Sequence, residues 1–92
     1  MRYHYEFTPT AQSKLKKLSR HNPRLVEMIM RKIIWLAEHA EEIAHRAIRG
    51  SPFYSLHSGP YRIPYLLDKR RQRIIIDDIA QHDPAYDRIR RI

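Results

Sequence analysis

Apolar and polar side chains alternate at the start of the chain. Tyr3, Tyr5 and Phe7 are separated by single polar residues, and this period of two places three aromatic rings on one face of a strand. Thr8 and Pro9 then form a helix start, because threonine caps free backbone N–H groups and proline is tolerated in the first helical turn. The pattern predicts a β-strand followed directly by a helix.

Two helices are predicted after this strand. The first is short, and its apolar stripe is made of Ala11, Leu15 and Leu18. Asn22-Pro23 repeats the start signal and precedes about four turns of apolar residues at helical spacing. These positions are Leu25, Val26, Ile29, Met30, Ile33, Leu36 and Ala37. After them the pattern weakens, and the residues up to Arg49 either extend the second helix or pack as a connector.

Three strands are predicted in the second half of the chain, at residues 53–56, 61–67 and 73–80, because aromatic and branched residues dominate there between turn-forming segments. They read as an antiparallel meander. The continuous apolar run at residues 74–76 favours a central strand that is covered on both faces. Pro64 removes a backbone N–H in mid-strand, so we expect a bulge or an unpaired edge there.

The element order is β-α-α-β-β-β, and a short C-terminal helix is predicted beyond its cap, Asp83. The fold class is α+β, with two N-terminal helices packed on a small antiparallel sheet. A chain of 92 residues closes only one core, so residues 1–92 are expected to form a single domain.

The chain is strongly basic. Lys and Arg number 18 against 10 Asp and Glu, a net charge of +8 that favours a polyanionic or acidic partner. There is no cysteine, which excludes disulfides, thiolate metal sites and a cysteine nucleophile, and makes the cytoplasm the expected compartment. No stretch approaches the ~20 apolar residues that span a bilayer, and no signal peptide is seen, so membrane insertion is not expected.

Several kinds of site are disfavoured. Gly50 and Gly59 are the only glycines, too few for a phosphate-binding loop or a dinucleotide fingerprint, so we expect no nucleotide cofactor. None of the six histidines forms an i, i+4 pair around a glutamate, and a metal site assembled across the fold is a minor alternative. No Gly-x-Ser-x-Gly elbow is present.

Basic, phenolic and imidazole groups gather in the predicted β-rich half. They are Arg49, His57, Arg62, Lys69, Arg70, Arg71, Arg73, His82, Tyr86, Arg88, Arg90 and Arg91. Such groups suit metal-free RNA cleavage, which needs a base for the 2′-hydroxyl, cations for the phosphate and an acid for the leaving oxygen. For Arg70, Arg71 and Arg73, which lie around a predicted hairpin turn, plain solvation is the favoured interpretation. Trp35, on the long helix, either packs or contacts a partner, and packing is favoured.

Four short motifs follow one another in the chain. They are Leu15-Lys16-Lys17-Leu18, Ile48-Arg49-Gly50, the segment Ser58-Gly59-Pro60-Tyr61-Arg62-Ile63-Pro64-Tyr65, and the ending His82-Asp83-Pro84-Ala85-Tyr86. With the element order, they resemble the RelE/ParE toxin superfamily of type II toxin–antitoxin systems over nearly the whole chain. The most specific part is Gly-x-Tyr-Arg-x-x-Tyr, and the ending is similar to the RelE branch. The resemblance implies a curved antiparallel sheet with helices on one side.

RelE-like members cleave mRNA, often in the ribosomal A site. By resemblance, Arg62 matches the strand arginine that grips the scissile phosphate, and Tyr86 matches the C-terminal tyrosine placed at the 2′-hydroxyl or stacked near the cut. His82 stands where relatives have Arg or His, and could act as acid, base or charge donor. The lysines that RelE-type chains often carry before the motif are missing here, and we expect His57 to replace their positive charge.

The leading hypothesis is therefore a metal-independent mRNA endonuclease toxin in which Arg62, His57, His82 and Tyr86 act on the phosphate and its protons. The expected RNA-binding residues are Arg49, Lys69, Arg70, Arg71 and Arg73. One alternative is a ParE-like inhibitor of DNA gyrase without nuclease activity, and another is an inactive binding module. The resemblance also implies a cognate antitoxin with acidic, extended segments; mRNA and the ribosome are the other expected partners.

Overall fold

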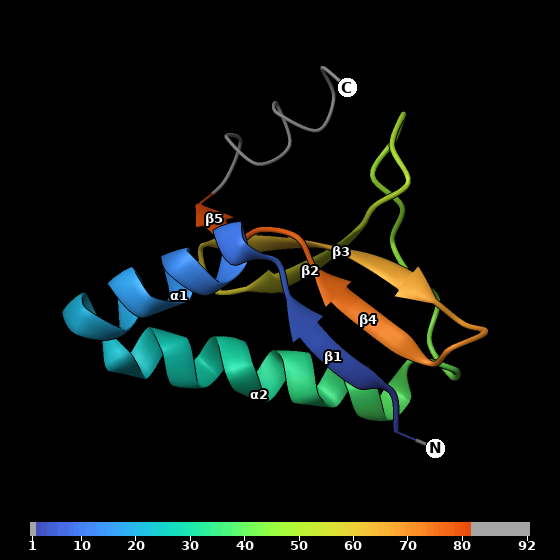
Figure 1. The fold of residues 1–92 in the computed structure, drawn as a ribbon, viewed down its shortest axis with the longest axis horizontal. Helices are drawn as coiled ribbons and strands as arrows, with labels where there is room; N and C mark the ends of the chain where they lie inside the picture. Colours follow the sequence, from blue (N-terminus) through green and yellow to red (C-terminus); the bar gives the residue numbers. More distant parts are fainter. Residues whose placement is uncertain (1, 82–92) are drawn as a thin grey trace.

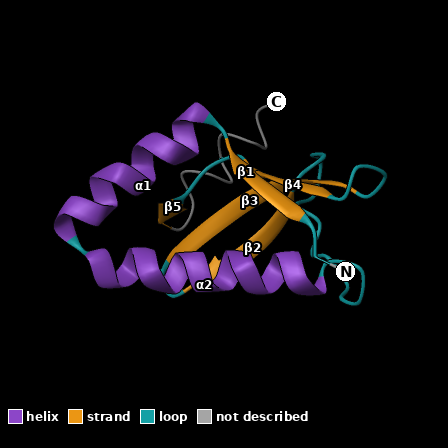
Figure 2. Cartoon of the chain, turned by 60° about the horizontal axis from the view of Figure 1, so that its bottom comes forward, coloured by secondary structure: helices purple, strands orange, loops and turns teal. Residues whose placement is uncertain are grey.

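The computed structural model describes residues 2–81, which form two helices and five strands (Figure 1). In chain order the elements are β1 (His4–Phe7), α1 (Pro9–His21), α2 (Pro23–His39), β2 (Tyr54–Ser58), β3 (Tyr61–Asp68), β4 (Arg73–Ile76) and β5 (Ala80–Gln81). The two helices follow one another and pack on the sheet (Figure 2). The predicted α+β fold with two N-terminal helices is confirmed. The predicted C-terminal helix lies outside the described residues.

The sheet has the order β1-β4-β3-β2. β2, β3 and β4 pair antiparallel, so the predicted meander is confirmed. β1 pairs with β4 in parallel, which makes the sheet mixed. The residue pattern of a single strand does not reveal the direction of its neighbour. A parallel neighbour needs a long crossover connection, and here the two helices and the β2–β3 hairpin supply it.

Both predicted helix starts are confirmed. The Thr8 hydroxyl oxygen accepts a hydrogen bond from the Ala11 backbone N–H at 3.2 Å, and the same hydroxyl donates to the Asp77 carbonyl oxygen at 2.7 Å. The Asn22 side-chain oxygen accepts from the Leu25 N–H at 3.3 Å. α2 ends at His39, so the residues that follow form a connector and do not extend the helix.

The strand predicted at residues 73–80 was wrong in its length. β4 ends at Ile76, the chain leaves the ladder, and Ala80–Gln81 returns to pair with the start of β3. Asp78 lies in this interruption and is almost completely buried, with a carboxylate oxygen 2.8 Å from the Lys14 ammonium nitrogen. The same oxygen accepts from the Ile79 N–H at 2.8 Å. A buried carboxylate needs such partners, and they turn the chain away from β4.

Pro64 lies opposite Ser55 in an unbroken β2–β3 register, so the expected bulge is absent from this pair. The Pro64 carbonyl oxygen accepts from the Asp77 N–H at 2.9 Å, on the side of β3 away from β2. The nitrogen of a strand residue faces the same side as its carbonyl, so the missing N–H faces the interruption between β4 and β5. The proline therefore removes no ladder hydrogen bond, in line with the expected unpaired edge.

β4 lies between β1 and β3, as predicted for the apolar run, but it is not covered on both faces. Ile74 and Ile76 are fully buried beneath the helices, whereas Ile75 points to the other face and is partly exposed. The continuous apolar run was therefore a wrong indication of double coverage.

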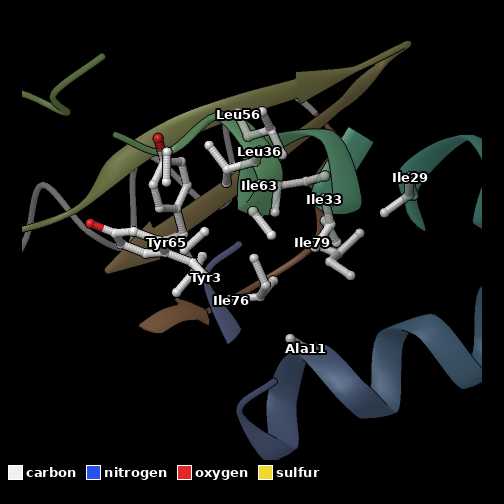
Figure 3. Close-up of a cluster of buried hydrophobic side chains, with 13 residues drawn as sticks. Tyr3, Ala11, Ile29, Ile33, Leu36, Leu56, Ile63, Tyr65, Ile76 and Ile79 are labelled. Atoms are coloured by element: carbon white, nitrogen blue, oxygen red, sulfur yellow. The ribbon is translucent and has the colours of Figure 1, made fainter. Parts of the chain in front are cut away.

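The core fills the space between α2 and the sheet (Figure 3). Ile29, Ile33 and Leu36 of α2 are fully buried, and Ile33 and Leu36 lie beside Ile63 of β3 (Figure 3). Each such aliphatic side chain contributes about 1.5–3 kcal/mol by leaving water. This packing holds β3, the strand that carries the Gly-x-Tyr-Arg motif.

His45 fixes the connector after α2 to this core. Its Nε2 lies 2.7 Å from the Ala40 carbonyl oxygen, which can only accept, so Nε2 carries the proton. Its Nδ1 then accepts from the Tyr65 hydroxyl at 2.6 Å. Burial, and secondarily the neighbouring Tyr54, raises the pKa of Tyr65, so this hydroxyl stays protonated and able to donate. The histidine pattern gave no sign of this contact.

Replacing Thr8 with alanine removes a helix cap and the hydroxyl that reaches Asp77. We expect the free energy of unfolding to fall by about 1–2 kcal/mol in urea denaturation. Thr10→Ala, an exposed threonine of α1, is the matched control and should change it by less than half as much. Equal losses in the two variants would contradict the capping role.

The variant Tyr65→Phe keeps the ring but removes the donor to His45. We expect a loss of about 1 kcal/mol in unfolding free energy, measured by urea denaturation. Tyr54→Phe is the control, because Tyr54 packs against both partners with its ring. If Tyr54→Phe lowers the free energy of unfolding as much as Tyr65→Phe does, the hydrogen bond between Tyr65 and His45 has no stabilising role.

Candidate functional site

Two of the four predicted catalytic residues lie opposite each other in the β2–β3 hairpin. His57 pairs with Arg62, and the Arg62 guanidinium nitrogen Nη1 donates to His57 Nε2 at 2.8 Å. The Ser55 N–H bonds outward to the Arg46 carbonyl, so the backbone of His57, two residues on, also faces away from β3. His57 and Arg62 are therefore a non-hydrogen-bonded pair, the kind that brings cross-strand side chains closest.

The alternation of the strands puts this pair on the face of the sheet away from the helices. Leu56 and Ile63 face the core, and the adjacent His57 and Arg62 point to the opposite face. The pair lines a hollow of about 260 Å³ together with the turn residues Gly59 and Pro60. The site is open enough to receive a chain from solvent.

Gly59 fixes the geometry of this turn. Ser58 pairs with Tyr61, so the loop has only two residues, and Gly59 has φ +56°. Tight hairpins of this kind need a positive φ at the first loop position, which glycine adopts without strain. The glycine of the motif thus sets the register that faces His57 with Arg62.

His57 is held in its neutral form. Partial burial of the ring is the largest cause that lowers the pKa of His57 below 6.5, followed by the positive charges of Arg62, Arg46 and Lys32. Arg62 always carries its protons, so it donates and Nε2 of His57 accepts. The lowered pKa argues against the expectation that His57 replaces the positive charge of missing lysines, since a neutral ring offers a lone pair near neutral pH.

The predicted RNA-binding residues do not gather around this pair. Lys69, Arg70 and Arg71 lie in the β3–β4 turn, at the far end of β3 and about 20 Å along the strand from Arg62. Arg49 lies in the connector before β2. Their role in RNA binding stays a prediction.

Arg73 opens β4 and is engaged within the sheet. Its Nη1 lies 3.5 Å from a carboxylate oxygen of Glu6, and its buried Nε has no hydrogen-bond partner within residues 2–81. Arg73 is thus held at the end of the sheet away from His57.

His82 and Tyr86 lie outside the described residues, and their catalytic roles stay predictions. The described chain ends with β5, in which Ala80 pairs with Arg62 and Gln81 pairs with Tyr61. β5 therefore lies beside Arg62.

The sequence did not predict a role for Lys32 and Arg46 near the pair, and for Trp35 it favoured packing. Lys32 and Arg46 act on His57 by charge, although they come from α2 and the connector. Trp35, for which packing was favoured, is 39% exposed on α2. The exposed helical stripe at positions 28, 32 and 35 was the available signal, whereas the closeness of Arg46 depends on the connector's path.

Within residues 2–81, no three histidine or carboxylate side chains come together as metal ligands. In the same part of the chain, neither helix combines the length and apolarity that crossing a membrane requires.

A family model described as the ParE toxin of the type II toxin–antitoxin system, parDE, matches residues 5–86. No curated protein sequence matches significantly.

Solved structures share the fold. The RelBE2 toxin–antitoxin complex from Mycobacterium tuberculosis matches with a TM-score of 0.71 and 22% identity, over 89% of this chain and 100% of the other. A mutant of the E. coli toxin RelE in the free state matches with a TM-score of 0.74 and 20% identity, over 97% of this chain and 94% of the other. The chromosomal ParDE system from P. aeruginosa matches with a TM-score of 0.72 and 17% identity, over 89% of this chain and 98% of the other. By its sequence, this chain belongs to the ParE toxins of type II toxin–antitoxin systems, within the RelE/ParE superfamily that its motifs resemble.

Proposed function

We propose that this toxin cleaves mRNA without a metal ion, by attack of a 2′-hydroxyl on the adjacent phosphate, and that it does so at the ribosome. The observation that supports this most is the Arg62–His57 pair, which joins a permanent cation to a neutral imidazole at 2.8 Å. A phosphate-binding group next to a base is the minimum that this reaction requires.

The reaction follows from the hydrogen bond within the pair. A scissile phosphate accepts the N–H groups of Arg62 and draws the guanidinium away from His57. The released Nε2 lone pair then takes the proton of the 2′-hydroxyl, the O2′–P bond forms, and the P–O5′ bond breaks. The products are a 2′,3′-cyclic phosphate and a 5′-hydroxyl, whose proton comes from an acid, for which His82 and Tyr86 are the candidates.

We propose a cognate antitoxin as the protein partner, acting in the cytoplasm. The related structures include toxin–antitoxin complexes. A groove between α1 and the β3–β5 edge is lined by the apolar Leu18 and Ile79 and by the basic Lys17 and Lys14, of which Lys14 is also paired with Asp78. An acidic, partly apolar segment is complementary to this groove.

The second candidate function is inhibition of DNA gyrase by protein contacts, as in ParE-like toxins. The family model that matches the chain is the ParE model, and this favours the candidate. In that case the His57–Arg62 pair has no catalytic task, so the variants below separate the two functions.

Arg62→Ala is expected to lower mRNA cleavage by about 100-fold or more, because it removes the cation that stabilises the phosphate charge. The measurement is controlled expression followed by primer extension on several transcripts. Tyr86→Phe tests the C-terminal tyrosine in the same assay. Arg20→Ala, an exposed arginine near the end of α1, is the control and should cut as the wild type does.

New 5′ ends in transcripts from cells that express the wild type, absent when Arg62→Ala is expressed, would support the nuclease function. Intact transcripts together with arrested growth and blocked supercoiling, unchanged in Arg62→Ala, would assign the toxin to gyrase inhibition instead.

The titration of His57 gives a further test. Its folded pKa lies below 6.5, so between the two values the unfolded chain binds more protons and the folded state loses stability as the pH falls. NMR of the ring protons should show this lowered pKa. Arg62→Gln removes one of the three positive charges that lower the pKa of His57 and should raise that pKa towards 6.5, only in part because burial remains; Arg20→Gln should leave it unchanged. A wild-type pKa at or above 6.5 would contradict the neutral base.

A further inference from the structure

A second hollow adjoins the one at Arg62. It has a volume of about 410 Å³ and lies between one stripe of α2 and the β2–β3 turn. Its lining includes Met28, Arg31, Lys32 and Trp35 from α2, with His57 and Gly59 from the hairpin. His57 and Gly59 also line the first hollow, so the two hollows adjoin at these residues.

The second hollow combines exposed apolar surface with positive charge. Met28 is 44% exposed and Trp35 39%, and they are the exposed large hydrophobic side chains of the described residues. Lys32 and Arg31 stand beside them, although a guanidinium nitrogen of Arg31 also lies 2.9 Å from the Glu27 carboxylate. Among residues 2–81, no carboxylate side chain lines the hollow itself. The Lys32 ammonium nitrogen lies 5.0 Å from the centre of the indole ring, while the His39 ring stacks on Trp35 with centroids 5.0 Å apart.

We propose that this hollow is a nucleotide subsite for single-stranded RNA, in which a base stacks on Trp35 and a backbone phosphate binds Lys32. The proposal rests on the proposed nuclease function and extends it from the scissile phosphate to a neighbouring nucleotide. Exposed aromatic rings interleaved with cations are the chemistry by which proteins hold single-stranded RNA. A strand whose phosphate sits at Arg62 reaches Trp35 by passing over His57.

The position of Lys32 fits this use. Its ammonium group lies over the indole ring, where a stacked base would lie, and an exposed cation–π contact is weaker than base stacking. The base therefore displaces Lys32 from the ring, and the flexible side chain turns to the phosphate. His39 remains stacked on the ring and keeps its orientation through the hydrogen bond between its Nδ1 and the Trp35 carbonyl, 2.8 Å long.

The chain contains a single tryptophan, so its fluorescence reports on this hollow alone. The probe is a short single-stranded RNA with 2′-O-methyl groups, which binds but has no 2′-hydroxyl to attack. Inorganic polyphosphate is the control ligand, because it carries the charge without the bases. We expect the RNA to quench Trp35 as it binds, and polyphosphate to bind without comparable quenching.

Variants separate stacking from charge. Trp35→Ala should weaken RNA binding about tenfold, and Trp35→Phe should recover most of that loss. Lys32→Gln should reduce the slope of log affinity against log salt concentration by about 0.7, the value for one phosphate contact on a single strand. Lys16→Gln, an exposed lysine of α1 away from the hollow, is the matched control and should leave binding nearly unchanged. Circular dichroism verifies that each variant is folded.

The possible failures are distinguishable. Cleavage of mRNA by a wild type whose Trp35 is not quenched, or equal RNA affinity in folded Trp35→Ala, would overturn the subsite and leave the nuclease standing. A wild type that neither binds nor cuts RNA would overturn both. Quenching by poly-glutamate but not by RNA would assign the hollow to an acidic protein partner and overturn the subsite.

Discussion

The register of β2 against β3 is the constraint on which the core and the site both depend. Side chains of a strand alternate between its faces, so a slip of β2 by one residue against β3 would exchange the faces of Leu56 and His57. The slipped strand would turn a histidine towards α2 and expose a leucine, and the same slip of β3 would do this to Arg62 and Ile63. The two-residue turn at Gly59 prevents this slip, because its positive φ closes the hairpin at Ser58 and Tyr61.

A second constraint is the break after β4. Asp78 is buried and needs both Lys14 and the Ile79 N–H, while Thr8 holds the neighbouring carbonyl of Asp77. Lys14 belongs to α1, and Thr8 is the residue that precedes this helix. These contacts turn the chain towards the start of β3, where β5 pairs beside Arg62. Thr8 and α1 thus help to hold β5 beside Arg62.

The elements that the sequence predicted well are those set by local chemistry. Thr8 and Asn22 cap helices by bonding N–H groups three residues on, and Gly59 closes a turn by its own backbone freedom. These interactions need no knowledge of the rest of the fold. The helix starts and the hairpin were predictable for that reason.

The misjudged features depend on contacts between distant segments. The parallel pairing of β1, the contact of His45 with Tyr65 and the charge state of His57 each depend on groups from separate elements. A histidine in an alternating strand can be read as a cation or as a base, and only its neighbours decide. The distance between Arg62 and the cations Lys69, Arg70 and Arg71 also depends on the fold. Arg62 lies near the start of β3, and the three cations lie in the turn after its end.

The direct hydrogen bond between Arg62 and His57 has a consequence for how the site is used. Arg62 donates to the same His57 lone pair that would serve as a base. In the free protein this hydrogen bond therefore engages both an N–H group of Arg62 and the Nε2 lone pair of His57. In the proposed reaction, a phosphate competes for the guanidinium and frees the imidazole, because its bond to Arg62 is charge-assisted on both sides and is stronger than the bond to a neutral ring nitrogen. Binding of the phosphate and exposure of the base would then be one event. A surface used only for protein contacts would gain nothing from this coupling, because it requires no free lone pair at His57.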